Sequence, residues 1–201
     1  MKHWVKSAIA LLESSLKPVP TELNELDWKS DISSNKDKLT KHLSAFANNI
    51  NGGYLVFGIN ETTGQLCDIT DDSAEKIIQQ LSNLAREALE PKVSIDHSII
   101  KFQETNLLLV WVKESRSKPV CLRGKPIDYC FIRSGGTTRQ ASRQEIGFFL
   151  LHNPTLRWEQ LRASRLLSQY ELIDKLDIHS IFSLLKLPVP ESSPKVAVNS
   201  L

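Results

Sequence analysis

Residues 44–61 read SAFANNINGGYLVFGINE, and the rest of the predicted fold is arranged around this stretch. Its first part closes a run in which Leu39, Leu43 and Phe46 recur at the three- and four-residue spacing of a helix. Its last part, residues 54–59, is a short apolar run bounded by glycines, which is typical of a buried strand. The sequence therefore predicts a helix that turns directly into a central strand.

The glycine pair Gly52-Gly53 has two interpretations. Consecutive glycines can present backbone amides to a phosphate, and they also commonly close a helix, because glycine readily adopts the left-handed conformation of a C-cap. The position directly after a helix favours the cap. The sequence lacks the Gly-Lys-Ser/Thr ending of a P-loop, so we expect no ATP site in this chain.

Two further elements precede this stretch. Residues 2–16 carry apolar side chains at helical spacing, which predicts a helix that either packs on the domain or serves as an arm for a partner. Residues 25–29 alternate polar and apolar, which is the period of a half-buried strand. We expect Glu25, Asp27 and Lys29 to share the solvent-exposed face of that strand.

Three signals predict the starts of other helices. Ser34 with Asp37 resembles a capping box for the helix that leads into the glycine pair. Asp72 is expected to cap a second helix, and Ser142 with Glu145 forms another plausible capping box.

Three further apolar segments predict strands. Residues 93–100 and 107–113 are joined by a polar turn, and residues 129–133 end at Gly135-Gly136. We expect the strands near Asp27, Leu55, Leu109 and Phe131 to share one sheet. The fold class is therefore α+β, with a mixed central sheet, flanking helices and a C-terminal helical extension.

The chain divides into four predicted parts. They are an N-terminal helix at residues 1–20, the main domain at 21–153, a helical extension at 154–187 and a linker-like tail at 188–201. The tail is rich in proline and serine, which is typical of linkers, so we expect it to lead towards a further C-terminal region.

Composition limits the class of protein. The 201 residues are 41% hydrophobic and 24% charged, which suits a globular domain, and no apolar run reaches the roughly 18 residues of a membrane span. We expect a cytoplasmic protein. The net charge of +2 is too small to indicate nucleic-acid binding by itself. Cys67, Cys121 and Cys130 are odd in number and widely spaced, so we expect neither disulfides nor zinc.

Three stretches together resemble the AlbA-like core of the Schlafen family, in its simpler bacterial form. They are ELNELDWK at residues 22–29, the stretch at residues 44–61, and FIRSG at residues 131–135. The resemblance spans about residues 21–153. It implies binding of RNA or DNA, because bacterial members are described as DNA-binding or regulatory domains, whereas animal members cleave transfer and ribosomal RNA.

The resemblance also implies a metal site. The nuclease members hold a divalent metal with three acidic residues, whose positions fall here on Glu22, Asp27 and Glu61. Carboxylate oxygens suit Mg²⁺ or Mn²⁺, and Lys29 could offset their repulsion or bind a phosphate. Asp27 stands where the nucleases have glutamate, and Glu61 stands where they have aspartate. Because one side chain is shorter and the other longer than in the nucleases, they would place a metal differently. Alternatively, the three acidic residues are ordinary solvated side chains.

Basic residues form a second candidate site. They occur at the start of the helix after Ser34 and around the Gly135-Gly136 turn, and they would neutralise phosphates and make binding salt-dependent. A solvated charged face is the alternative. We expect Arg133 and Arg139 to contact phosphate, with folding unaffected when either is replaced by alanine. The candidate nucleic-acid-binding residues are Lys36, Lys38, Arg123, Lys125, Arg133 and Arg139.

Three function classes remain open. They are a metal-dependent endoribonuclease acting on structured RNA such as tRNA, a non-catalytic DNA-binding regulatory module, and a protein-interaction domain of a larger defence or transcription-regulating protein. Animal Schlafen cores pair two such lobes into one basic valley. A chain with a single lobe is therefore expected to form a homodimer.

Overall fold

The computed structural model describes residues 2–17, 23–33, 35–152 and 182–184. The chain divides into two compact units, residues 1–156 and 157–201, and every element described below belongs to the first unit. In the second unit, residues 182–184 are helical, and the remainder of the predicted extension and tail lies outside the described residues.

A mixed sheet of four strands forms the centre of the domain. Its strands are β1 (Leu26–Lys29), β2 (Gly53–Phe57), β4 (Ile95–Phe102) and β5 (Thr105–Val112), in the order β1-β2-β5-β4. The pair β1 and β2 is parallel, and the other pairs are antiparallel. β4 and β5 are joined by a tight turn. The predicted fold class and the central position of the 54–59 strand are thus confirmed.

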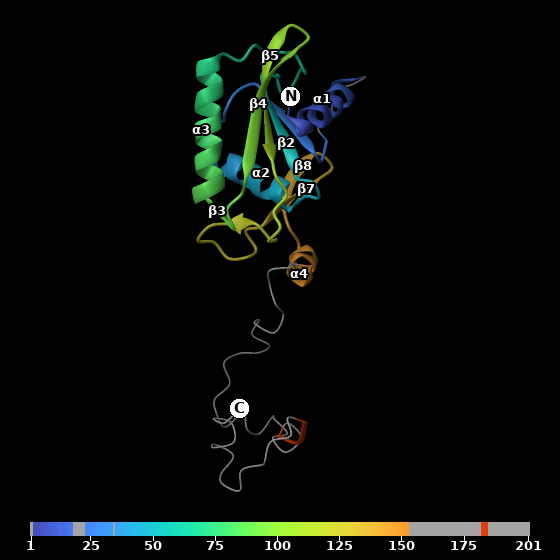
Figure 1. Cartoon of the computed structure of the whole chain (residues 1–201), viewed down its shortest axis with the longest axis vertical. Coiled ribbons are helices and arrows are strands. Elements are labelled where there is room, and N and C mark those ends of the chain that lie inside the picture. The colour runs from blue at the N-terminus through green and yellow to red at the C-terminus, as the bar shows by residue number, and fades with distance from the viewer. Residues whose placement is uncertain (1, 18–22, 34, 153–181, 185–201) are drawn as a thin grey trace. The chain divides into compact units, whose positions relative to one another are not determined.

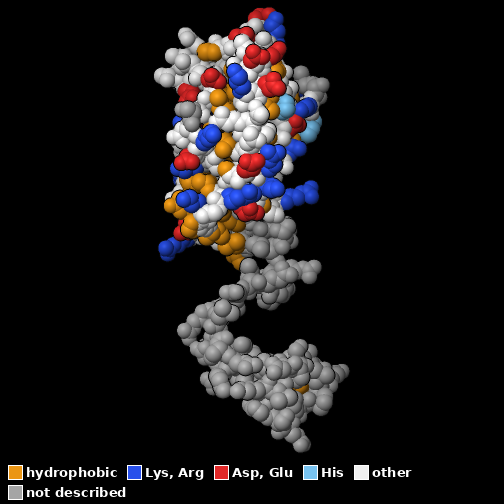
Figure 2. Space-filling model, turned by 90° about the vertical axis from the view of Figure 1, so that its left-hand side faces the viewer, with side chains coloured by type: hydrophobic (Ala, Val, Ile, Leu, Met, Phe, Trp, Pro, Cys, Tyr) orange, Lys and Arg blue, Asp and Glu red, His pale blue; other side chains and the backbone are white. Residues whose placement is uncertain are grey.

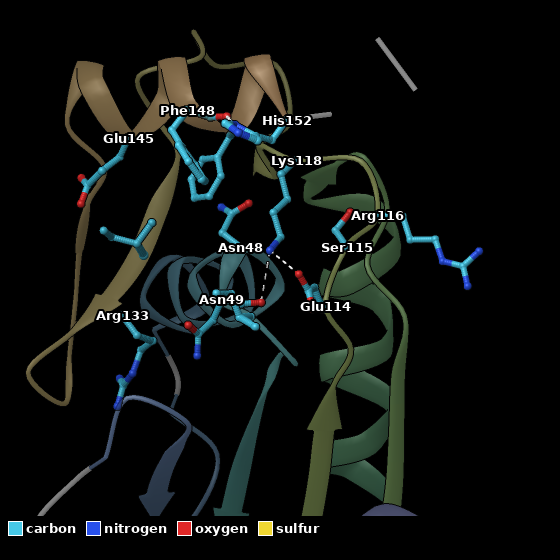
Figure 3. A pocket seen from close by; sticks show the side chains of 13 residues that line it. Asn48, Asn49, Glu114, Ser115, Arg116, Lys118, Arg133, Glu145, Phe148 and His152 are labelled. Atoms are coloured by element: carbon cyan, nitrogen blue, oxygen red, sulfur yellow. Dashed lines mark hydrogen bonds and ion pairs between the residues drawn. The ribbon is translucent and has the colours of Figure 1, made fainter. Parts of the chain in front are cut away.

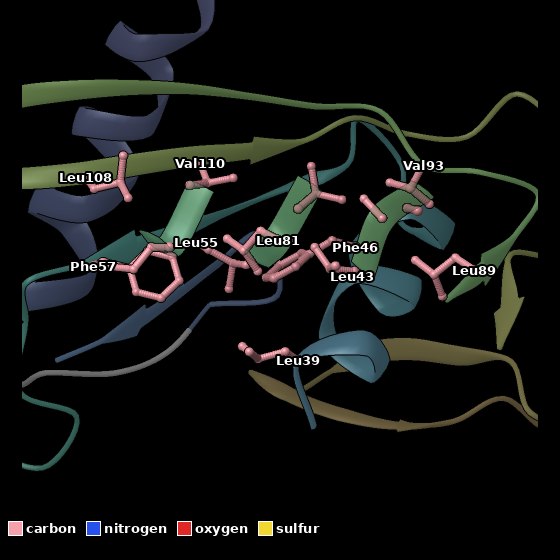
Figure 4. Close-up of a cluster of buried hydrophobic side chains, with 14 of the residues drawn as sticks. Leu39, Leu43, Phe46, Leu55, Phe57, Leu81, Leu89, Val93, Leu108 and Val110 are labelled. Atoms are coloured by element: carbon pink, nitrogen blue, oxygen red, sulfur yellow. The ribbon is translucent and has the colours of Figure 1, made fainter. Parts of the chain in front are cut away.

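Helices cover both faces of this sheet (Figure 1). α1 (His3–Leu16) packs on one face, and α2 (Lys36–Asn48) and α3 (Asp71–Glu87) pack on the other. Figure 4 shows the second interface, where Leu43 and Phe46 of α2 meet Leu55 of β2. α1 therefore packs within the domain, which was the first of its two predicted roles.

Strand alternation assigns each side chain to one of these two interfaces. In β2, Leu55 and Phe57 face α2 and α3, while Val56 faces α1. In β1, Leu26 and Trp28 face α1. Because successive side chains in a strand point to opposite faces, the polar residues of β1 lie on the α2 side.

The glycine pair allows the sharp connection between α2 and β2. Gly52 adopts a φ of +77°, and a Cβ atom there would lie 2.1 Å from the Val112 carbonyl oxygen. At Gly53 a Cβ atom would lie 1.9 Å from Cδ1 of Phe46. Side chains at these two positions are excluded, so the pair serves close packing of helix, strand and the neighbouring β5.

Two small two-stranded sheets lie beside the main one. β3 (Leu89–Glu90) pairs with β6 (Cys121–Leu122), and β7 (Phe131–Ser134) pairs with β8 (Thr137–Gln140). The prediction that the Phe131 strand joins the central sheet is wrong, because Gly135 and Gly136 form a tight turn that returns the chain as β8. Cys121 lies opposite Cys130 in an antiparallel bridge, a proximity that their spacing in the sequence did not indicate.

The helix caps follow the predicted residue types at partly different positions. The capping box of Ser142 and Glu145 is confirmed at the start of α4 (Arg143–Leu151). The prediction for Asp72 is wrong, because the Thr70 side chain accepts the capping hydrogen bond and α3 begins at Asp71. Asn35 caps α2, and Ser34 lies outside the described residues.

Candidate nucleic-acid interface

Asp27 and Lys29 form the buried centre of the candidate site. Their side chains are 0% and 4% exposed, so the prediction that they lie on a solvent-exposed face is wrong. Glu25, which precedes β1, is exposed as expected. Polar and apolar side chains do alternate along β1. The face that carries Asp27 and Lys29, however, packs against α2 and the β7–β8 hairpin and is not exposed to water.

Three cationic or titratable side chains surround the Asp27 carboxylate. Its Oδ1 lies 3.2 Å from Lys29 Nζ, and its Oδ2 lies 3.2 Å from His42 Nδ1. Arg133 Nη1 lies 3.9 Å from the same Oδ2. Lys29 Nζ also approaches Glu61 Oε2 at 3.7 Å. Two of the predicted acidic residues therefore meet at one ammonium group.

Arg133 is held in place from several sides. Its Nη2 donates to the Leu23 carbonyl at 2.9 Å, and its Nη1 donates to Thr138 Oγ1 at 3.3 Å. The guanidinium lies 5.0 Å from the centre of the Phe46 ring, a cation–π geometry. The side chain is 0% exposed, so its main role in the described structure is to link β7 to β1 and α2.

His42 is the neutral member of this group. Burial lowers its pKa to about 4 against the opposing effect of Asp27. Lys29 and Arg133 lower the pKa further. The ring is therefore uncharged at neutral pH, and Nδ1 lies 3.0 Å from Thr138 Oγ1 as well as near Asp27.

A hollow of about 270 Å³ opens above this network, and we call it the basic hollow. Lys38 is exposed at its edge and Lys41 is half-buried, both from the first turns of α2. Neither lysine forms an ion pair with any residue in the described part of the chain. The lining residues are Lys29, Lys38, Lys41, His42, Glu61, Arg133, Thr137 and Thr138.

The other predicted basic residues lie elsewhere. Arg123 pairs with Glu90 on β3, with Nε 3.2 Å from Oε2. Lys125 lies 5.8 Å from the centre of the Tyr129 ring. Arg139 binds Glu145 through both terminal nitrogens, which lowers the pKa of Glu145 to about 2.

Lys36 begins α2 but does not line the basic hollow. Figure 2 shows charged side chains of both signs over the face that α3 covers. Of the six predicted nucleic-acid-binding residues, the structure brings Lys38 and Arg133 together at the hollow. The remaining four lie on other surfaces, and two of them, Arg123 and Arg139, are ion-paired there.

The sequence interpretation missed His42 and Thr138. His42 lies between Leu39 and Leu43 on the helix face that packs inward, and a polar residue within such an apolar stripe is a signal for a buried polar contact. Thr138 carried no local signal, because only the hairpin brings it beside α2.

The described residues do not form a metal site by themselves. Among them, no three His, Cys, Asp or Glu side chains lie close enough together to hold an ion. Asp27 and Glu61 approach each other through Lys29, and Glu22 lies outside the described residues.

The chain belongs to the Schlafen, AlbA_2 family, whose model matches residues 22–142. This membership confirms the resemblance seen in the sequence and supports a nucleic-acid-binding domain. No curated protein matches the chain. Across the described residues, no helix combines the length and apolar character needed to cross a membrane.

Solved structures that are similar to the chain include one from Corynebacterium diphtheriae and one from Nitrosomonas europaea. The DIP2311 protein from Corynebacterium diphtheriae is 16% identical with a TM-score of 0.49, covering 74% of this chain and 32% of that one. The chain thus spans about a third of that protein. The N-terminal domain of a protein from Nitrosomonas europaea, named as related to the ATP-dependent DNA helicase RecG, is 21% identical with a TM-score of 0.48, covering 67% of this chain and 92% of that one.

Proposed function

We propose that this chain is a nucleic-acid-binding module that holds phosphate groups at the basic hollow. The observation that carries this proposal is the pair Lys38 and Lys41, which lie at the hollow without an ion pair among the described residues. Lysine ammonium groups bind phosphate as point charges. Family membership supports the same function.

The position of these lysines on α2 strengthens the site. Lys38 and Lys41 project from the first turns of the 13-residue helix, whose N-terminus carries a partial positive charge. Helix N-termini favour phosphate for this reason. Beneath them, the buried Lys29 and Arg133 offset the charge of Asp27, and Lys29 Nζ also lies 3.7 Å from Glu61, the carboxylate that lines the hollow.

The test is a comparison of two double variants by fluorescence anisotropy with DNA and RNA oligonucleotides. Lys38→Ala/Lys41→Ala should weaken binding of any sequence and lower the slope of log affinity against log salt by about two, since each lost phosphate contact removes roughly one unit. The control is Lys6→Ala/Lys101→Ala, which removes the same charge from α1 and β4. Equal affinities for both double variants would contradict the proposed binding face.

Metal-dependent cleavage of structured RNA is the second candidate function. The favouring observation is that Asp27 and Glu61, two of the three acidic residues implied by the family, share contact with Lys29. Incubation of the purified chain with tRNA and duplex DNA, with and without Mn²⁺, tests it. Cleavage that requires Mn²⁺ and is lost in Glu61→Gln supports a nuclease; intact nucleic acid under all conditions favours the binding module.

A further inference from the structure

A second and larger hollow is also lined in part by strand β7, and we call it the aromatic hollow. Its volume is about 770 Å³, within the range of roughly 300–1,000 Å³ that small-molecule sites occupy. Its walls come from the end of α2, the loop at residues 114–118, β7 and α4 (Figure 3). The family match ends at residue 142, so α4 is a feature that this match does not include.

Aromatic rings form one wall of the aromatic hollow. Phe148 is 58% exposed, and its ring stacks on His152 with centroids 4.0 Å apart and an interplanar angle of 28°. Figure 3 shows Phe148 directed from α4 into the hollow. Phe149 also lines it, with Lys118 Nζ 5.9 Å from the ring centre. An exposed aromatic side chain beside open space is a surface on which another flat ring can stack.

The two acidic residues of this hollow are already paired. Glu145 binds Arg139 at 2.8 Å and 3.0 Å, and Glu114 binds Lys118 at 2.5 Å. Arg116 adds an exposed guanidinium at the edge, directed away from Phe148 in Figure 3. A ligand with a negatively charged backbone therefore meets no uncompensated carboxylate among these residues.

The two hollows are neighbours. Arg133 borders both, and α2 contributes to both: its first turns bring Lys38 and Lys41 to the basic hollow, and its last residue, Asn48, lines the aromatic hollow. Lys38 and Asn48 are ten residues apart on this helix, about 15 Å at 1.5 Å per residue, so a strand of a few nucleotides can reach from one hollow to the other. Alternating phosphates and bases are the repeating chemistry of a nucleic-acid strand.

We propose that the aromatic hollow binds an unpaired base of a single-stranded nucleic acid, stacked on Phe148, while the strand's phosphates lie at the basic hollow. This inference rests on the proposed function and specifies its ligand as single-stranded. A base inside a duplex is stacked on both faces and paired at its edge, so it cannot present a face to Phe148 without leaving the helix. Sequence tolerance is expected, because every base has a π face.

The experiment compares single-stranded and duplex oligonucleotides of one sequence, as DNA and as RNA, by fluorescence anisotropy. Phe148→Ala should weaken binding of single strands about tenfold, the effect of losing one stacked base, and leave duplex binding within about twofold. Phe148→Trp should retain single-strand binding. The control is Leu151→Ala, which truncates an 85% exposed side chain of the same helix that does not line the hollow.

A fluorescent base reports on the contact directly. A strand containing 2-aminopurine should change its emission on binding to the unmodified chain and lose that change with Phe148→Ala. Thermal unfolding of each variant checks that the fold is retained, which the exposure of Phe148 predicts.

The outcomes separate this inference from the proposed function. If single strands bind Phe148→Ala and the unmodified chain equally, or duplexes bind better than single strands, the base site is wrong while nucleic-acid binding stands. If neither form binds the unmodified chain, the proposed function fails first. A fall in melting temperature for Phe148→Ala with unchanged nucleic-acid affinity would assign Phe148 a role in packing within the domain and overturn the inference.

Discussion

Asp27 places a negative charge in the interior of the domain, and its neighbours decide whether that is tolerable. Removing a carboxylate from water carries a penalty of several kcal/mol that only close and well-oriented partners offset. Lys29, His42 and Arg133 lie within 3.9 Å of its oxygens. The group is therefore a coupled network, in which removal of one member leaves the others buried without their charge partner.

Replacing Arg133 tests this network. Arg133→Ala should lower the free energy of unfolding by about 3–5 kcal/mol, because it leaves Asp27 with fewer partners in a buried site. This differs from the sequence-based expectation that folding would be unaffected. Arg139→Ala is the matched control, since Arg139 is 44% exposed and water screens its ion pair with Glu145, so its loss should leave the urea midpoint nearly unchanged. Urea unfolding measures both, and identical midpoints would contradict the network.

His42 gives the domain a specific dependence on pH. Its pKa is lowered from 6.5 to about 4 in the fold, so between these values the unfolded chain binds more protons. The contribution of neutral His42 to stability is complete above about pH 6.5 and is lost as pH falls towards 4, by about 3 kcal/mol in all.

Urea unfolding from pH 7.5 to 4.5 should therefore show a steeper loss of stability in the unmodified chain than in His42→Gln. The glutamine variant retains a polar side chain but cannot titrate in this range. It is therefore the control that shows how much stability the rest of the chain loses as pH falls. Parallel curves for the two proteins would show that His42 does not carry this dependence.

At the scale of elements, the junction of α2 and β2 fixes the position of the site. α2 carries Lys38, Lys41 and His42, and β2 holds β1 in parallel register beside it. The turn at residues 49–52 and Gly53 let the helix end close against the sheet. A displacement of this junction would therefore move the lysines relative to Asp27.

Substitution at the junction tests how tightly it is packed. Gly53→Ala places a Cβ atom 1.9 Å from Cδ1 of Phe46, so we expect a loss of at least about 2 kcal/mol and weaker nucleic-acid binding. Gly147→Ala, in α4 with no neighbouring atom within 4 Å of the new Cβ, should be neutral or stabilising by up to about 1 kcal/mol. Calorimetric melting of both variants measures the contrast, and an unchanged Gly53→Ala would show that the junction can relax.

At the scale of the whole molecule, the described part of the chain carries the basic hollow and the aromatic hollow on one domain. We propose that two copies associate so that their hollows form a longer continuous site, since two-fold pairing is the commonest way to extend such a surface. Light scattering in moderate salt should then give about twice the 22.7 kDa chain mass. A mass equal to one chain at every concentration, with nucleic-acid binding retained, would assign binding to a single domain.

Local patterns in the sequence determined most of the fold. Helical spacing at Leu39, Leu43 and Phe46, the apolar strand that follows, and the capping box at Ser142 depend on neighbours a few residues away, so they were predictable. The motif stretches were also sufficient to identify the family. These signals determine which elements form and which residues share a face.

Only the tertiary structure decided what covers each face. The alternation of β1 placed Asp27 and Lys29 together, but whether water or protein meets them depends on α2 and on the β7–β8 hairpin, which lies more than 100 residues later. The contact of Arg133 with the Leu23 carbonyl spans 110 positions, and no local pattern encodes it. Burial, and with it the pKa of His42, is therefore a property of long-range packing, because the desolvation that sets it depends on every element that surrounds the group.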